Sequence, residues 1–188
     1  MNVPAQIPAV GLARPFIGFT SADFIEMMES GAFGDMRVEL VEGGLQKMAP
    51  AYGGHGQANV SIAAKLITAF VGRNVSIAAD LAVRIDEATI RGIDIAVGLD
   101  PFPARAAAQA NTVWLAVEIA DTTLERDLGA KASDYARGGI PNYWVVDLVG
   151  SAVHVMSAPG EDGYAIRTIT RFGEDLAVPG TDAVIVVA

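Results

Sequence analysis

The sequence predicts a single domain of the α/β or α+β class, in which helices flank a mixed β-sheet. Its 188 residues fit one domain, and 52% hydrophobic against 19% charged residues provide enough apolar material for a core. Segments with the helical period alternate with segments that have the strand period. One strand–helix–strand unit, from 113 to 147, has the arrangement of a right-handed crossover between parallel strands. We assign residues 16–188 to this domain and expect residues 1–15 to form a flexible arm.

The first elements predicted along the chain are a helix from Thr20 to Gly31, a hairpin of strands 37–42 and 45–48 that turns at Gly43-Gly44, and, after a turn at Gly53-Gly54, a second helix over 57–71. Thr20 and Asp23 have the spacing of a capping box. The hairpin strands alternate apolar and polar residues, and adjacent glycines supply the positive φ angles of a two-residue turn. The second helix carries an apolar stripe that we expect to face the core, made of Val60, Ala63, Ala64, Ile67 and Val71.

The remaining predicted elements are strands at 81–86, 90–99 and 112–119, a helix at 124–137, and strands at 142–148, 152–157, 164–170 and 183–187. Strands 90–99 and 112–119 are apolar nearly throughout, which is typical of central strands buried on both faces. The segment between them contains Pro101 and Pro103 and predicts a mobile surface loop.

Two acidic residues lie inside these central strands. Asp94 and Glu118 each have branched apolar neighbours on both sides. A buried, unpaired carboxylate costs several kcal/mol, so each must be paired, protonated or bound to a metal. Two carboxylates on adjacent strands suit a hard divalent cation such as Mg²⁺ or Mn²⁺. The alternative is that each acid pairs with an arginine such as Arg84 or Arg91.

Lys131 and Glu39 are further candidates for the same site. Lys131 lies on the helix that follows the strand of Glu118 and packs back on the sheet, where it would orient a water nucleophile or offset charge on a phosphate. The alternative for this lysine is a surface pair with Asp127. Glu39 offers a third carboxylate, for which an exposed face shared with Arg37 is the alternative.

Composition excludes several kinds of site. The chain has no cysteine, which removes disulfides, thiolate zinc sites and cysteine nucleophiles. Its two histidines, His55 and His154, are too few for an all-histidine zinc site. His55, at the entry to the second helix, is instead a candidate substrate contact, with a solvated loop histidine as the alternative. Phosphate loops of the Walker type, G-x-G-x-x-G and G-x-S-x-G motifs are absent.

Charge and hydropathy bear on partners and location. Thirteen basic against 22 acidic residues give a net charge of −9, so a long-range basic funnel for nucleic acid is absent and DNA is only weakly supported as a partner. No stretch approaches the roughly 18 to 20 apolar residues of a membrane span. The first 13 residues carry no charge, so the basic start of a secretory signal is missing. We therefore expect a cytoplasmic protein without membrane contact.

The chain carries several motifs in this order: Thr20-Ser-Ala-Asp-Phe, Val38-Glu-Leu-Val-Glu-Gly, His55 after a small loop, Asp94-Ile-Ala-Val, Val117-Glu-Ile-Ala-Asp-Thr-Thr-Leu-Glu-Arg-Asp, and Lys131-Ala-Ser-Asp-Tyr-Ala-Arg-Gly-Gly-Ile-Pro-Asn-Tyr-Trp-Val-Val-Asp. With these motifs the chain resembles the Uma-two family, a former domain of unknown function assigned to the PD-(D/E)XK, restriction-endonuclease-like fold. The resemblance extends from about Phe16 to the C-terminus, and its last block is the most specific.

The resemblance implies a nuclease core with Mg²⁺ held at a mixed sheet. Asp94 then matches the motif aspartate and Glu118 the second acid, and both are metal ligands. Lys131 corresponds to the family's lysine, moved onto the next helix, because Ala120 stands where a strict E-x-K motif has lysine. Glu39 matches the glutamate of the early strand that often completes this type of site.

The chain departs from the family pattern at three places. Ile93 stands where the family usually has proline before its aspartate, and Gly44 stands where a second glutamate usually follows the hairpin glycine. Ala120-Asp121-Thr122 replaces a serine-proline-serine segment. Gly44 bears on whether catalysis is retained, since the glutamate it replaces is a candidate ligand.

Three functions fit these residues. The first is a metal-dependent endonuclease that hydrolyses DNA phosphodiester bonds, acting as a homodimer so that two copies cut two strands. The second is a catalytically degenerate nuclease-fold protein that acts as a binding or scaffold module, which the acidity and the departures favour. The third is hydrolysis of a small phosphate ester, for which the same ligands would serve.

Overall fold

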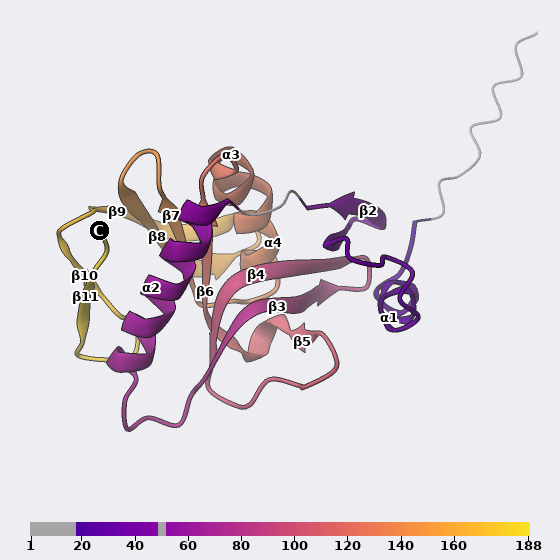
Figure 1. Cartoon of the computed structure of the whole chain (residues 1–188), viewed down its shortest axis with the longest axis horizontal. Coiled ribbons are helices and arrows are strands. Elements are labelled where there is room, and N and C mark those ends of the chain that lie inside the picture. The colour runs from indigo at the N-terminus through magenta and orange to yellow at the C-terminus, as the bar shows by residue number, and fades with distance from the viewer. Residues whose placement is uncertain (1–17, 49–51) are drawn as a thin grey trace, which may run out of the picture.

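A computed structural model describes residues 18–48 and 52–188. It confirms a mixed sheet flanked by helices (Figure 1). The expected N-terminal arm, residues 1–15, lies outside the described residues. Within the described part of the chain, no helix is long and apolar enough to cross a membrane.

The first half of the domain contains these elements: α1 (Ser21–Glu29), β1 (Val38–Val41), β2 (Gly44–Lys47), α2 (Gly53–Ala69), β3 (Ser76–Asp86), β4 (Thr89–Gly98) and β5 (Ala108–Gln109). The capping box of α1 is present, since Thr20 and Asp23 each bond the other's backbone N–H. The hairpin turn differs from the prediction by one residue. Val41 pairs with Gly44, so the turn residues with positive φ are Glu42 and Gly43.

The second half contains β6 (Val113–Ala120), α3 (Leu124–Arg126), a π-turn (Asp127–Lys131), α4 (Ala132–Arg137), β7 (Asn142–Asp147), β8 (Ala152–Gly160), β9 (Gly163–Arg171), β10 (Asp175–Ala177) and β11 (Val184–Val186). β6 and β7 pair in parallel, which confirms the predicted crossover. The short strands β5 and β10 were not predicted. The expected loop between the central strands is irregular from 99 to 107, and Phe102 in it packs against the core.

Two hydrophobic cores lie on opposite faces of the sheet. The helix α2 covers one face, with Ile62 and Leu66 buried against β6 and β7. The segment from α3 to α4 covers the other, with Tyr135 at its centre. The predicted stripe of α2 is wrong: Val60 and Ile67 are largely exposed, as are Ala64 and Val71. The predicted turn at Gly53-Gly54 is the first turn of this helix instead.

The sheet forks at β4, and the fork creates the space for a site. β3 pairs with β4 along the whole of one edge, so β1 and β6, which also pair with β4, share its other edge. β1 meets it at Ile90, whereas β6 meets it from Ile95 onward. Among the described strands, none pairs with residues 91–94 on this side. Backbone groups there need other partners.

Candidate functional site

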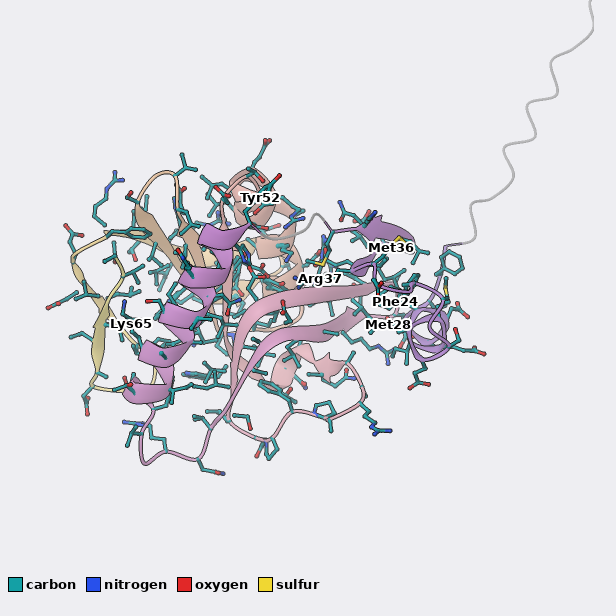
Figure 2. The ribbon with its side chains drawn as sticks, viewed as in Figure 1. Phe24, Met28, Met36, Arg37, Tyr52 and Lys65 are labelled. Carbon is teal, nitrogen blue, oxygen red and sulfur yellow. The ribbon has the colours of Figure 1, made fainter. Side chains whose placement is uncertain are left out.

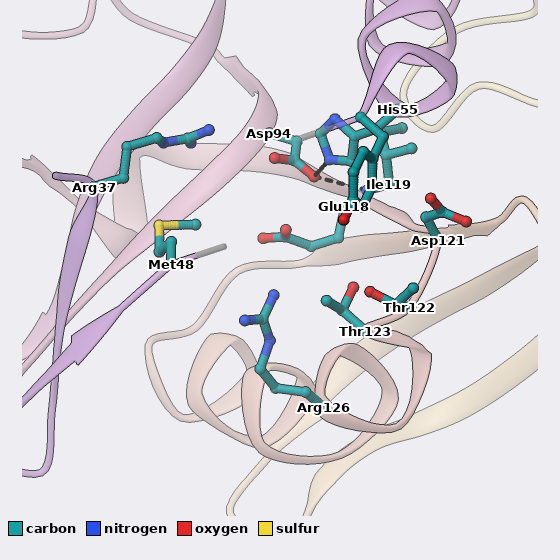
Figure 3. Close-up of a pocket in the computed structure, with 11 residues that line it drawn as sticks. Arg37, Met48, His55, Asp94, Glu118, Ile119, Asp121, Thr122, Thr123 and Arg126 are labelled. Atoms are coloured by element: carbon teal, nitrogen blue, oxygen red, sulfur yellow. Dashed lines mark hydrogen bonds and ion pairs between the residues drawn. The ribbon is translucent and has the colours of Figure 1, made fainter. Parts of the chain in front are cut away.

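A small pocket of about 90 Å³ opens beside this fork (Figure 3). Its walls come from the residues that flank the early hairpin, the start of α2, the middle of β4, the end of β6, and the segment that leads from β6 into α3. The lining residues are Arg37, Met48, Tyr52, His55, Asp94, Glu118, Ile119, Asp121, Thr122, Thr123 and Arg126. Asp94 and Glu118 are nearly fully buried, yet both reach the pocket.

Asp94 is held as a carboxylate by donors from two elements. Its Oδ2 accepts from the backbone N–H of Ile119 at 2.8 Å and lies 3.1 Å from Nε2 of His55. Burial by itself would raise the pKa of Asp94, but these two bonds and the charge of Lys131 hold that pKa below its usual value. The bond to Asp94 in turn raises the pKa of His55. The sequence-based alternative of a pair between this aspartate and an arginine is not seen among the described residues.

Glu118 is held by side chains of the segment that follows β6. Its Oε1 lies 2.9 Å from Nζ of Lys131 and accepts from the hydroxyl of Tyr135 at 2.6 Å. Burial raises the pKa of Glu118 to about 8, although the charge of Lys131 opposes this. A divalent cation bound in the pocket would favour the ionised form of this carboxyl group.

Lys131 and Glu39 bridge the fork from the side away from the pocket. Lys131 Nζ donates to the backbone carbonyl of Gly92 at 2.8 Å, and Oε1 of Glu39 accepts from Gly92 N–H at 2.9 Å. These side chains thus replace the missing strand. The two side chains lie 3.4 Å apart, and Glu39 also accepts from Arg91 at 3.0 Å. Lys131 and Glu39 are each at most 1% exposed. The alternative of a surface pair with Asp127 for Lys131 is therefore wrong, and so is the alternative of an exposed face for Glu39.

The charges of this cluster are matched. Burial lowers the pKa of Lys131, but the carboxylates of Glu118 and Glu39 raise it by more, so the amino group stays cationic. Burial raises the pKa of Glu39, and Lys131, Gly92 N–H and Arg91 lower it by more. Arg91 extends the cluster to Asp134 on α4, at 2.6 Å. A buried network of this kind fixes geometry, and loss of one member is costly.

A π-turn in the helix after β6 sets which residues face this cluster. The extra residue in the turn places both Asp127 and Lys131 on the buried side. Asp127 is 1% exposed, bonds Thr123 Oγ1, and accepts from Nε of Arg126 at 3.2 Å. Its backbone carbonyl accepts from the hydroxyl of Tyr143 at 2.9 Å, which ties the turn to β7.

The structure therefore gathers all five candidates around the fork, but in two layers. Asp94, Glu118 and His55 line the pocket, whereas Lys131 and Glu39 lie behind it. The catalytic, substrate-binding and metal-binding roles of these residues stay predictions. Sequence reasoning did not single out Arg126, which lines the pocket, although its place on the helix that follows the strand of Glu118 was visible.

The donor set suits a hard divalent cation. Asp94 and Glu118 offer carboxylate oxygens toward one pocket (Figure 3). Within residues 18–48 and 52–188, no group of three or more His, Asp or Glu side chains is spaced to hold a metal ion. Mg²⁺ commonly binds through one or two carboxylates and fills its remaining positions with water and substrate oxygens. Two protein carboxylates beside an open pocket meet that requirement.

Comparisons with known proteins agree with the expected family. The sequence matches the model of the Uma2 family, described as "Putative restriction endonuclease", over residues 22–185. The fold is similar to the crystal structure of "a putative nuclease belonging to DUF820" from Anabaena variabilis ATCC 29413, with a TM-score of 0.64 and 15% identity over 82% of this chain and 88% of that one. No curated protein matches the sequence. Because the family model spans most of the domain, this chain belongs to the Uma2 family, and the structural match shows that the two proteins share a fold.

Proposed function

We propose that this protein is a metal-dependent nuclease that hydrolyses DNA phosphodiester bonds in the pocket lined by Asp94 and Glu118. One observation carries the proposal: two buried carboxylates from adjacent strands reach one small pocket that opens to solvent. A divalent cation bound there would lower the pKa of a water molecule and neutralise charge on the leaving oxygen. Membership of the Uma2 family supports the same reaction class.

The side chains around the pocket have distinct parts in this function. Ile119 N–H and His55 orient Asp94 and keep it ionised, ready to bind a cation. A cation bound in the pocket would favour the ionised form of Glu118, whose carboxyl group Tyr135 and Lys131 hold in position. The buried layer behind the pocket also excludes water from the far side of the site.

A binding or scaffold role is the second candidate, and one observation favours it. The amino group of Lys131 is fully buried in ion pairs and is not part of the pocket wall. In this arrangement the lysine stabilises the fold and does not reach a water molecule in the pocket.

Calorimetric titration with Mn²⁺ separates the two candidates. We expect saturable binding to the wild type and its loss in Asp94→Asn and Glu118→Gln, which remove one ligand charge each at nearly constant shape. Glu161→Gln, in the exposed turn between β8 and β9, is the matched control and should bind as the wild type does. A plasmid and oligonucleotide cleavage assay in Mn²⁺ then tests hydrolysis. Absence of binding at millimolar Mn²⁺, or binding that survives both substitutions, contradicts the nuclease proposal and favours the scaffold role.

A further inference from the structure

We propose that Arg126 binds the anionic oxygen of the substrate phosphate, on the wall of the pocket opposite Asp94. This inference rests on the proposed function, because it requires that a phosphodiester group enters the pocket. It adds a substrate-binding residue that neither the sequence motifs nor the family resemblance assigned.

The stem of Arg126 is anchored, and its far end is free. Nε donates to Asp127, which is itself buried and bonded to Thr123. Figure 3 shows the guanidinium group extending from the helix into the pocket toward Glu118. Within residues 18–48 and 52–188, no hydrogen bond or ion pair joins either terminal nitrogen to another group. The side chain is 31% exposed, so these nitrogens are accessible from the pocket.

A guanidinium group held in this way suits a phosphate. Its two terminal nitrogens present parallel N–H donors that match two phosphate oxygens. Because a guanidinium group is weakly hydrated, removing it from water costs little free energy. Fixing the stem beforehand reduces the entropy lost when the substrate binds.

The other cations near the site are already engaged. Arg37 also lines the pocket, but its terminal nitrogen lies 2.6 Å from Asp80. Lys131 is buried among Glu118, Glu39 and the Gly92 carbonyl. Arg126 is therefore the pocket-lining cation, among the described residues, whose terminal donors are available. With two carboxylates for a cation and one arginine for an anion, the pocket has the charges that a metal-associated phosphate needs.

The test is a cycle that removes the two partners in turn. The two proteins compared are the wild type and Arg126→Gln. The reference ligand is a fluorescein-labelled single-stranded DNA 10-mer with phosphodiester linkages throughout. In the comparison ligands, uncharged methylphosphonate replaces either the central linkage or every linkage. Affinities are measured by fluorescence anisotropy in Mn²⁺. We expect the wild type to prefer the phosphodiester ligand by about tenfold or more, since charge-assisted hydrogen bonds contribute on that scale. Arg126→Gln should lose most of this preference, and Arg126→Lys should keep part of it.

Controls separate this inference from the proposed function. Arg105→Gln changes the net charge equally at an exposed loop residue that does not line the pocket, and it should behave as the wild type. Mn²⁺ calorimetry on Arg126→Gln should still show saturable binding, which shows that the variant is folded and its carboxylate site intact. If Arg126→Gln keeps the full preference for phosphodiester, or if the wild type shows none, Arg126 does not bind the phosphate. Failure of the wild type to bind Mn²⁺ contradicts the proposed function instead.

Discussion

At the scale of single residues, Glu118 stands out because it is an acid with a raised pKa at the centre of a charged cluster. Its pKa of about 8 in the folded protein compares with an ordinary value of 4.5. The unfolded chain therefore loses this proton first as the pH rises. Between pH 4.5 and 8, the contribution of Glu118 therefore lowers the free energy of unfolding progressively as the pH rises. Below pH 4.5 both states hold the proton, and Glu118 does not change that free energy.

Glu118→Gln should remove this pH dependence, because glutamine resembles the neutral acid. In metal-free buffer we expect a small difference in the free energy of unfolding at pH 5. By pH 9 the variant should gain about 3 to 5 kcal/mol over the wild type. Urea unfolding at pH 5, 7 and 9, with chelator present, measures this difference. The lowered pKa values of Asp94 and Glu39 affect stability only at acidic pH and in both proteins alike. Parallel pH profiles for the two proteins would show that Glu118 is ionised in the fold at neutral pH.

At the scale of elements, the π-turn between α3 and α4 decides which side chains are buried. It lets Asp127 and Lys131 face the core while Arg126 faces the pocket. Deletion of Gly129 would restore a regular α-helix and rotate one flank of the turn by about a third of a revolution. We expect this deletion to cost at least about 3 kcal/mol of stability, since it takes Lys131 or Asp127 from its buried partners.

Gly129→Ala is the matched control for that deletion. Gly129 is exposed, and nothing lies within 4 Å of where its Cβ would be. Alanine should therefore stabilise the protein by about 0.5 to 1 kcal/mol through helix propensity. Chemical denaturation of both variants measures the contrast. A deletion variant as stable as the wild type would mean that the turn has no part in placing the cluster.

The elements also show what the sequence can and cannot predict. Continuous apolar runs identified the central strands, and acids within those runs identified Asp94 and Glu118. Helix α2 was misoriented because it carries two apolar stripes, and periodicity alone does not tell which one faces the sheet. The gap at residues 91–94 arises from pairing between β4 and two distant strands, so no local pattern reveals it. The placement of Lys131 and Glu39 behind the pocket depends on that gap.

At the scale of the whole molecule, the net charge of −9 sets how DNA can be bound. Affinity for duplex DNA usually rests on many lysine and arginine contacts to phosphates, each of which releases counterions. Among the described residues, the arginine and lysine side chains that line the pocket are Arg37 and Arg126. Binding must then rest on few phosphate contacts together with the bound cation. The expected homodimer, which stays a prediction, would double that number.

The salt dependence of DNA binding measures the number of contacts directly. With Arg126 as the phosphate contact of each copy, the slope of log affinity against log salt concentration should be about −1 for one subunit and about −2 for a dimer. Anisotropy titrations from 50 to 300 mM salt at fixed free Mn²⁺ give the slope, and sedimentation velocity at the same concentrations gives the number of copies. Arg126→Gln should make the slope shallower by about one unit per copy, whereas Arg105→Gln should leave it unchanged. A slope far steeper than −2 would mean that basic residues other than Arg126 contact DNA, and that a separate binding surface exists despite the acidic net charge.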